Sequence, residues 1–156
     1  MRIKFLYKSV SFIFLFTASI ISAQTKREME KIFKNSISQP KKSKIIVGQN
    51  SWKICVDISS NTINLFETKF EKYADCCRYD EWTFYKKNKF IKNEAYSCKE
   101  PPYSKVTTQD DWYEIEYVEA ENLVLVIKSQ KRTDKFIVKE LQKRKDNLHI
   151  IKLVKI

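Results

Sequence analysis

The sequence predicts an all-β protein: a closed antiparallel up-and-down barrel of about eight strands, with a short N-terminal segment that can form a helical turn. Apolar and polar residues alternate with a period of two along most of the chain after Ser51, as in strands with one buried face. The alternating runs are short, and mostly short polar links join them. The chain also has four cysteines, an even number that suits disulfides between neighbouring strands.

The amino terminus has the pattern of a secretory signal peptide. A positively charged head precedes an apolar run from Ser9 to Ile21, and the small residue Ala23 stands where signal peptidase would cut. The run of about 13 residues is too short to span a bilayer, which needs roughly 20. We therefore expect residues 1–23 to be removed after Ala23, leaving a secreted or periplasmic protein without a transmembrane anchor.

The formal net charge of +11 is concentrated at the amino-terminal end. The first 23 residues carry three Lys/Arg and no Asp/Glu, and the basic lead-in of residues 24–44 carries seven against two. From residue 45 onward, 20 Lys/Arg stand against 17 Asp/Glu, a net charge of only +3. This near balance in the predicted barrel domain, residues 45–156, argues against nucleic acid as a partner.

Within the lead-in, Glu28 to Phe33 can form a helical turn or two with three apolar residues on one side. The barrel strands follow. Trp52, Ile54 and Val56 alternate with polar neighbours, Ser59 to Asn61 make a turn, and Thr62 to Glu67 return.

The next predicted element is a hairpin. Strand formers occupy Trp82 to Tyr85 and Phe90 to Ile91, and Asn88 in the link between them tolerates the left-handed conformation of a tight turn. Two prolines then exclude a central strand from Lys99 to Ser104. Lys99 to Thr108 is the longest stretch outside the predicted strands and the expected contact loop. The remaining predicted strands are Trp112 to Val118, Leu123 to Ile127, Phe136 to Leu141 and Leu148 to Ile156.

The hairpin register brings a cysteine of the vicinal pair close to Cys98. If Phe84 faces Phe90, Cys76 lies opposite Cys98, whereas a slip of one residue puts Cys77 there instead. A bridge between the vicinal pair itself would be strained, so Cys55 should bond to whichever of the two remains. A metal site is disfavoured, because the sole histidine, His149, is distant in sequence and no Cys-x-x-Cys occurs.

This hairpin also resembles secreted bacterial lipocalin-like domains. The shared features are a cysteine, an acidic step, an aromatic Thr-Phe strand, a turn, an aromatic return strand and a second cysteine. In this chain they are Cys76, Asp80-Glu81, Trp82-Thr83-Phe84, Asn88, Phe90 and Cys98. The resemblance covers roughly Ser51 to Ile156 and departs from the family at Asn88, where the usual turn residue is Gly.

The resemblance implies a lipocalin-type barrel with an amino-terminal segment closing one end. It favours the disulfide Cys76–Cys98 and, with it, Cys55–Cys77. It also implies binding of a small molecule, since lipocalins bind ligands as a class.

The predicted inward-facing residues are apolar and aromatic, which suits a small hydrophobic ligand. They are Trp52, Ile54, Val56, Trp82, Phe84, Phe90, Tyr113, Ile115, Tyr117, Leu125, Ile127, Phe136 and Val138. The same residues would also suit a filled core, because bulky aromatics occupy space that a ligand would need. We therefore expect a monomeric carrier of a small hydrophobic ligand. The alternative is a non-catalytic interaction or inhibitor module, with a filled core, whose loops contact a protein or an envelope surface.

Catalysis is not expected, and neither is a cofactor or a metal. The chain has no Gly-x-Ser-x-Gly elbow, Gly-rich phosphate loop or His-Glu-x-x-His motif. The adjacent carboxylates Asp80-Glu81 and Asp110-Asp111 should point to opposite faces of a strand and flank strand ends at solvated turns, so neither pair forms an acid/base dyad.

Overall fold

The computed structural model describes residues 25–37, 50–56, 60–68, 76–98, 100–108 and 112–156. The predicted signal peptide and its cleavage point lie outside the described residues, as do the last part of the basic lead-in and the Asp110-Asp111 pair. Among the described segments, no helix is both long enough and apolar enough to span a bilayer.

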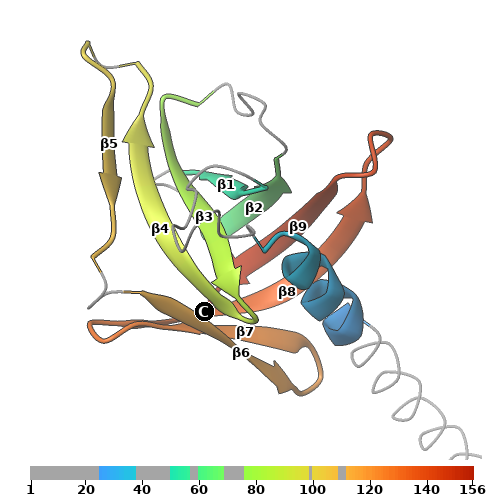
Figure 1. Cartoon of the computed structure of the whole chain (residues 1–156). Helices are drawn as coiled ribbons and strands as arrows, with labels where there is room; N and C mark the ends of the chain where they lie inside the picture. The colour runs from blue at the N-terminus through green and yellow to red at the C-terminus, as the bar shows by residue number, and fades with distance from the viewer. Residues whose placement is uncertain (1–24, 38–49, 57–59, 69–75, 99, 109–111) are drawn as a thin grey trace, which may run out of the picture.

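The strands of the described segments form one antiparallel sheet that closes on itself (Figure 1). Around the barrel, the order is β1-β2-β9-β8-β7-β6-β4-β3 and back to β1. The strands are β1 (Trp52–Cys55), β2 (Thr62–Glu67), β3 (Arg78–Lys86), β4 (Lys89–Tyr96), β5 (Tyr103–Val106), β6 (Tyr113–Glu119), β7 (Leu123–Lys128), β8 (Thr133–Lys143) and β9 (His149–Lys155). The prediction of an eight-stranded antiparallel barrel is confirmed, with β5 as an additional strand outside the ring.

One part of the barrel departs from the up-and-down order. The hairpins β3–β4, β6–β7, β7–β8 and β8–β9 are sequential, but β1 lies between β2 and β3 and pairs with both, while β2 pairs with β9. Because β2 and β3 are each antiparallel to β1, they run in the same direction and so do not form a hairpin with each other. The alternation of apolar residues predicts which segments form strands, but it does not predict which strands pair with each other in the sheet.

The segment predicted as a contact loop, Lys99 to Thr108, contains β5. All four residues of this strand are exposed, and it pairs with β4 on one side only. The expectation of an uninterrupted loop is therefore wrong, although the prolines do exclude a central strand, since β5 is at the edge of the sheet.

The β3–β4 hairpin has the predicted register, with Phe84 opposite Phe90. Asn88 has a φ of 59°, the left-handed conformation expected of it. The ladder ends at the pair Arg78 and Tyr96, and the chain bends at Cys77 and again at Ser97 and Cys98.

The bends change the disulfide pairing. The observed bonds are Cys55–Cys76, with Cα atoms 5.8 Å apart, and Cys77–Cys98, with Cα atoms 5.0 Å apart. The pairing Cys76–Cys98 with Cys55–Cys77 is therefore wrong, even though the register on which it depended is right. The straight-strand register cannot be extended past the end of the ladder: the chain bends there, so Cys98 meets Cys77 and Cys76 is left to bond with Cys55 in β1.

An amino-terminal helix, residues 25–35, closes one end of the barrel and confirms the predicted helical segment (Figure 1, blue). Its apolar residues Met29, Ile32 and Phe33 are buried in the barrel core. Phe33 stacks on Phe84 at 4.6 Å between ring centroids and meets Trp52 edge-on at 5.1 Å. The helix therefore fills the end of the barrel where these rings lie.

Two ion pairs and a hydrogen bond fix the helix to this closed end. Lys26 contacts Glu119 at 2.6 Å, and Glu30 contacts Lys87 of the β3–β4 turn at 3.5 Å. The indole N–H of Trp52 donates to Ser36 Oγ at 3.0 Å. Since the ion pairs are partly exposed and worth little, the buried rings hold the helix in place.

The disulfide pairing can be tested with two double variants. Cys77→Ser/Cys98→Ser removes one bridge, so it should leave no free thiol and lower the free energy of unfolding by about 2–5 kcal/mol. Cys76→Ser/Cys98→Ser breaks both bridges and should expose two thiols and cost more. Thiol titration in denaturant and urea unfolding measure both effects. A Cys76→Ser/Cys98→Ser protein that is the more stable of the two and has no free thiol would contradict the pairing.

The anchoring role of Phe33 predicts a large loss of stability on truncation. Phe33→Ala removes a ring that is 1% exposed, so the free energy of unfolding should fall by about 3–5 kcal/mol in urea titrations. The matched control is Lys34→Ala at the next, exposed helical position, which should change it by less than about 0.5 kcal/mol. Equal stability of the two variants would show that the helix does not belong to the core.

Candidate functional site

The barrel interior contains the residues predicted to face inward. Eleven of the thirteen are buried in one hydrophobic cluster: Trp52, Ile54, Trp82, Phe84, Phe90, Tyr113, Ile115, Leu125, Ile127, Phe136 and Val138. Tyr117 is partly buried against the same cluster, and Val56 follows β1 at the edge of a cavity. Sequence alternation therefore identified the interior, but it missed the apolar residues that the helix and β9 add to it, among them Phe33, Ile151 and Leu153.

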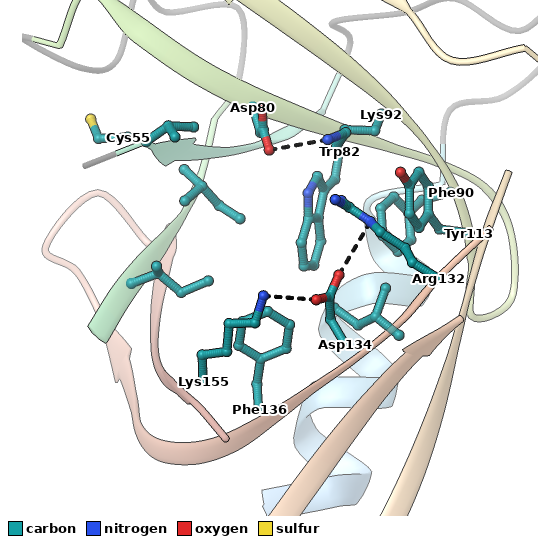
Figure 2. Close-up of a pocket in the computed structure, with 14 residues that line it drawn as sticks. Cys55, Asp80, Trp82, Phe90, Lys92, Tyr113, Arg132, Asp134, Phe136 and Lys155 are labelled. Atoms are coloured by element: carbon teal, nitrogen blue, oxygen red, sulfur yellow. Dashed lines mark hydrogen bonds and ion pairs between the residues drawn. The ribbon is translucent and has the colours of Figure 1, made fainter. Parts of the chain in front are cut away.

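A cavity of about 250 Å³ occupies the end of the barrel opposite the helix (Figure 2). Its apolar lining includes Ile54, Val56, Ile63, Ile127 and Phe136. The interior therefore combines the two alternatives that the sequence left open: aromatic rings and the helix fill the closed end, while the open end contains a space.

One wall of the cavity is a row of three stacked aromatic rings. Trp82 stacks on Phe90 with centroids 4.4 Å apart and planes at 21°, and Phe90 stacks on Tyr113 at 5.2 Å and 15°. The register explains the row, because Phe90 of β4 pairs directly with Tyr113 of β6. Because the rings stack face to face and Phe90 in the middle is 0% exposed, the row is a packed aromatic layer that borders the cavity.

Charged side chains surround the mouth of the cavity. On one side, the carboxylate of Asp134, near the start of β8, forms ion pairs with Arg132 at 3.2 Å and with Lys155 at 2.8 Å (Figure 2). Both cations are about half exposed, whereas Asp134 is 17% exposed. The carboxylate therefore holds the two flexible cations at the rim.

On the other side of the mouth, Lys92 contacts Asp80 at 3.4 Å and Glu94 at 2.7 Å. Burial raises the pKa of Asp80, and the neighbouring Lys92 ammonium only partly offsets this. Burial acts to lower the pKa of Lys92, but its contacts with Glu94 and Asp80 outweigh that effect, so this pKa is raised. The hydrogen bond from Lys92 lowers the pKa of Glu94. The Lys92 ammonium thus lies deep in the mouth, held charged by two carboxylates.

Two cations also face the aromatic wall. Lys92 Nζ lies 5.9 Å from the centroid of the Tyr113 ring, and the guanidinium carbon of Arg132 lies 5.6 Å from it. Both distances are within the range of a cation–π contact. Tyr113 is therefore the residue at which the apolar wall meets the positive part of the rim.

The charged residues of the mouth were not predicted as site residues, although their positions in the alternating pattern indicate that they face inward. Asp80 and Lys92 are two residues from Trp82 and Phe90, and Asp134 is two residues from Phe136. They therefore share the inward phase of their strands. A polar residue at an inward position near a strand end marks the mouth of a barrel.

Of the other carboxylate and histidine candidates, Asp80 lines the cavity, whereas Glu81 and His149 lie away from it. Asp80 and Glu81 point to opposite faces as predicted, but both lie within β3 and are mostly buried, so their predicted place at a solvated strand end is wrong. Glu81 contacts Ser51 and Asn93 on the outer face. His149 Nδ1 lies 2.6 Å from Glu67 Oε2, at the end where β8 turns into β9. Among the described residues, no group of three His, Cys, Asp or Glu is arranged to hold a metal ion.

No family model, curated protein or solved structure matches this chain. The barrel, its filled end and its charged mouth are therefore the observations from which a function can be derived.

The ion pairs of Lys92 with Asp80 and Glu94 predict how the free energy of unfolding depends on pH when Lys92 is replaced. In Lys92→Met, Asp80 loses its counter-charge and its pKa should rise further, while the pKa of Glu94 returns toward its ordinary value of 4.5. The lowered pKa of Glu94 stabilises the fold above that ordinary value, and this stabilisation is lost as the pH falls through the lowered pKa. Because the Glu94 side chain is 38% exposed and its ion pair is partly screened by solvent, Lys92→Met should cost about 1 kcal/mol near pH 7 and clearly less near pH 4.

Urea unfolding at the two pH values measures this difference. The matched control is Lys128→Met, whose partner Glu116 at 2.6 Å is 52% exposed. Such a surface pair should contribute less than about 1 kcal/mol at either pH. A loss for Lys92→Met that does not depend on pH would mean that its contacts with Asp80 and Glu94 do not stabilise the fold.

Proposed function

We propose that this protein is an exported, lipocalin-like binding protein that carries a small hydrophobic ligand in the open end of its barrel. The observation that carries the proposal is the cavity of about 250 Å³ with a wall of three stacked rings. Small-molecule sites are concave, mostly apolar and furnished with a few polar groups, and this cavity has all three properties.

The size of the cavity limits the ligand. Ligand pockets commonly measure about 300–1,000 Å³, so a space of about 250 Å³ suits a compact molecule or the apolar part of a larger one. At the closed end, Phe33 of the helix packs against Phe84 and Trp52 inside the barrel core. Entry through the charged mouth and docking against the aromatic wall are then the natural course of binding.

Export is supported by the cysteines and by the predicted signal peptide. The two disulfides use all four cysteines, which suits an oxidising compartment outside the cytosol. A carrier also needs no catalytic group, and we propose that the protein is not an enzyme.

A non-catalytic interaction module is the second candidate, and β5 is the observation that favours it. Among the described strands, β5 pairs with β4 alone, and its side chains Tyr103 and Val106 are 48% and 43% exposed. An exposed edge strand can pair with an extended segment of a partner. The cavity makes the carrier the better supported of the two.

Ligand binding can be tested with the neutral fluorescent probe N-phenyl-1-naphthylamine. Wild-type protein should enhance and saturate its fluorescence, because the probe can lie against the stacked rings. Ile63→Trp places an indole at the cavity from β2 and should weaken binding at least tenfold, which is about 1.4 kcal/mol.

The matched control is Asn64→Trp, which adds the same indole at the neighbouring exposed position of β2, on the outside of the barrel. It should bind the probe as the wild type does. Native mass spectrometry of the purified protein gives an independent readout of a retained small molecule. If the wild type fails to bind the probe, or if both variants bind it equally, the ligand is not in the barrel.

A further inference from the structure

The outside of the barrel carries a row of apolar residues where β6, β7, β8 and β9 lie side by side (Figure 1). Val118 of β6 lies opposite Val124 of β7 in the register. Ile137 of β8 in turn lies opposite Val124 on one side and opposite Val154 of β9 on the other. Directly opposite residues of antiparallel strands share one face of the sheet, so these four form a continuous row, which we call the outer row.

The outer row points away from the barrel core. The residues next to it in sequence, among them Leu125, Phe136 and Leu153, belong to the core cluster. Since neighbours in a strand point to opposite faces, the four residues of the outer row face outward. Val118 is 48% exposed, and the other three are half-buried. The row is therefore an apolar surface on the outside of the sheet.

The sequence of β7 fits a strand that is covered on both faces. All residues from Leu123 to Ile127 are apolar, including the outward-facing Val124 and Val126. Antiparallel strands with one face in water usually alternate apolar and polar residues, whereas strands covered on both faces are apolar throughout. Ile156 extends the apolar surface beyond β9 and is 63% exposed. An occupant of this face would remove these side chains from water.

We infer that the outer row is the interface with a second copy of this chain, in a weak dimer that forms reversibly as the concentration rises. This inference goes beyond the proposed function, because the outer row is on the outside of the barrel and none of its four residues lines the cavity. It also departs from the expectation of a monomer.

The shape of the outer row suits a second copy. Its residues are all Val or Ile, and they stand on a regular antiparallel ladder, so the surface has no large projecting side chain. Two such faces can pack against each other about 10 Å apart, as the two sheets of a β-sandwich do. The row contains no Trp or Tyr, the residues that are enriched where proteins meet the membrane surface.

Charged residues of both signs border the outer row. On one side of it, Glu116 and Lys135 are exposed and each lies opposite Val126 in the register. On the other side, the exposed Glu140 and Lys152 lie opposite each other. A second copy brings the same mixture of carboxylates and lysines, so opposite charges can meet across the interface. An anionic lipid surface would instead repel the two carboxylates.

The small size of the surface indicates a weak dimer. The outer row takes one residue from each of four strands, and its border adds a few more on each side. A standard stable interface has about 20–30 residues on each side. We therefore expect a dissociation constant on the order of 100 µM.

Sedimentation velocity on the mature protein, from about 10 µM to about 1 mM, tests the inference. The wild type should shift reversibly from monomer to dimer. Val118→Lys puts a charge into the apolar row once from each copy, so it should weaken the dimer at least about tenfold. The matched control is Val106→Lys on β5, which adds the same charge at a valine of similar exposure, 43%, and should dimerise as the wild type does. Urea unfolding of both variants verifies that they are folded.

Methyl NMR on the wild type locates the interface. The methyl signals of the four residues of the outer row should move as the concentration rises, and those of Val106 should not. In Val118→Lys, the remaining signals of the row should no longer depend on concentration.

Several outcomes would overturn the inference. One is a wild type that stays monomeric up to about 1 mM. Another is a dimer that Val118→Lys leaves unchanged, or that Val106→Lys weakens as much as Val118→Lys does. A third is flotation of the wild type, but not of Val118→Lys, with vesicles of phosphatidylglycerol and phosphatidylethanolamine, because the outer row would then bind lipid.

Discussion

Closure of the barrel depends on β1, because this four-residue strand joins β2 to β3 and so completes the ring. With four residues, β1 is near the short end of the usual range of strand lengths. Its first residue, Trp52, is fully buried between the helix ring of Phe33 and the neighbouring strands. Its last residue, Cys55, is bonded to Cys76 next to β3. The helix and the disulfide thus anchor β1 from opposite ends, and the interior exists because both anchors are present.

The filled and open ends of the barrel follow from the same alternation of residues. At the closed end, the inward positions hold rings that pack on one another and on the helix. At the mouth, the inward positions hold Asp80, Lys92 and Asp134, and burying these groups away from water would be costly. Packed aromatics therefore cannot extend to the mouth, and the space between the last ring and the charged rim is the cavity.

Sequence reasoning succeeded where the evidence is local. The inward phase of Phe84 and Phe90, the left-handed Asn88 and the apolar side of the helix each depend on residues close together in the chain. Sequence reasoning failed where the structure depends on which segments, distant in sequence, pair with one another. Nothing in the residues of β1 shows that it lies between β2 and β3, and the bends beyond Arg78 reverse the cysteine pairing that a straight ladder implies.

The charged residues at the mouth of the cavity show the same limit of prediction from sequence. The inward phase of Lys92 and Asp134 could be read from the alternation in β4 and β8, but their meeting around one cavity depends on the closure of the sheet.

The two disulfides lie at the open end of the barrel, where the proposed binding site would need rigidity. Both lie at the mouth, and since Cys76 and Cys77 are adjacent, the two bonds connect β1, the start of β3 and the end of β4 in series. Those strands carry Ile54, Asp80, Trp82 and Lys92 into the cavity. The helix cannot supply this restraint, because it packs at the other end of the barrel. Strand ends that are covalently fixed lose less freedom when a ligand binds, so the bonds that stabilise the barrel also hold its mouth in the shape that a ligand would meet.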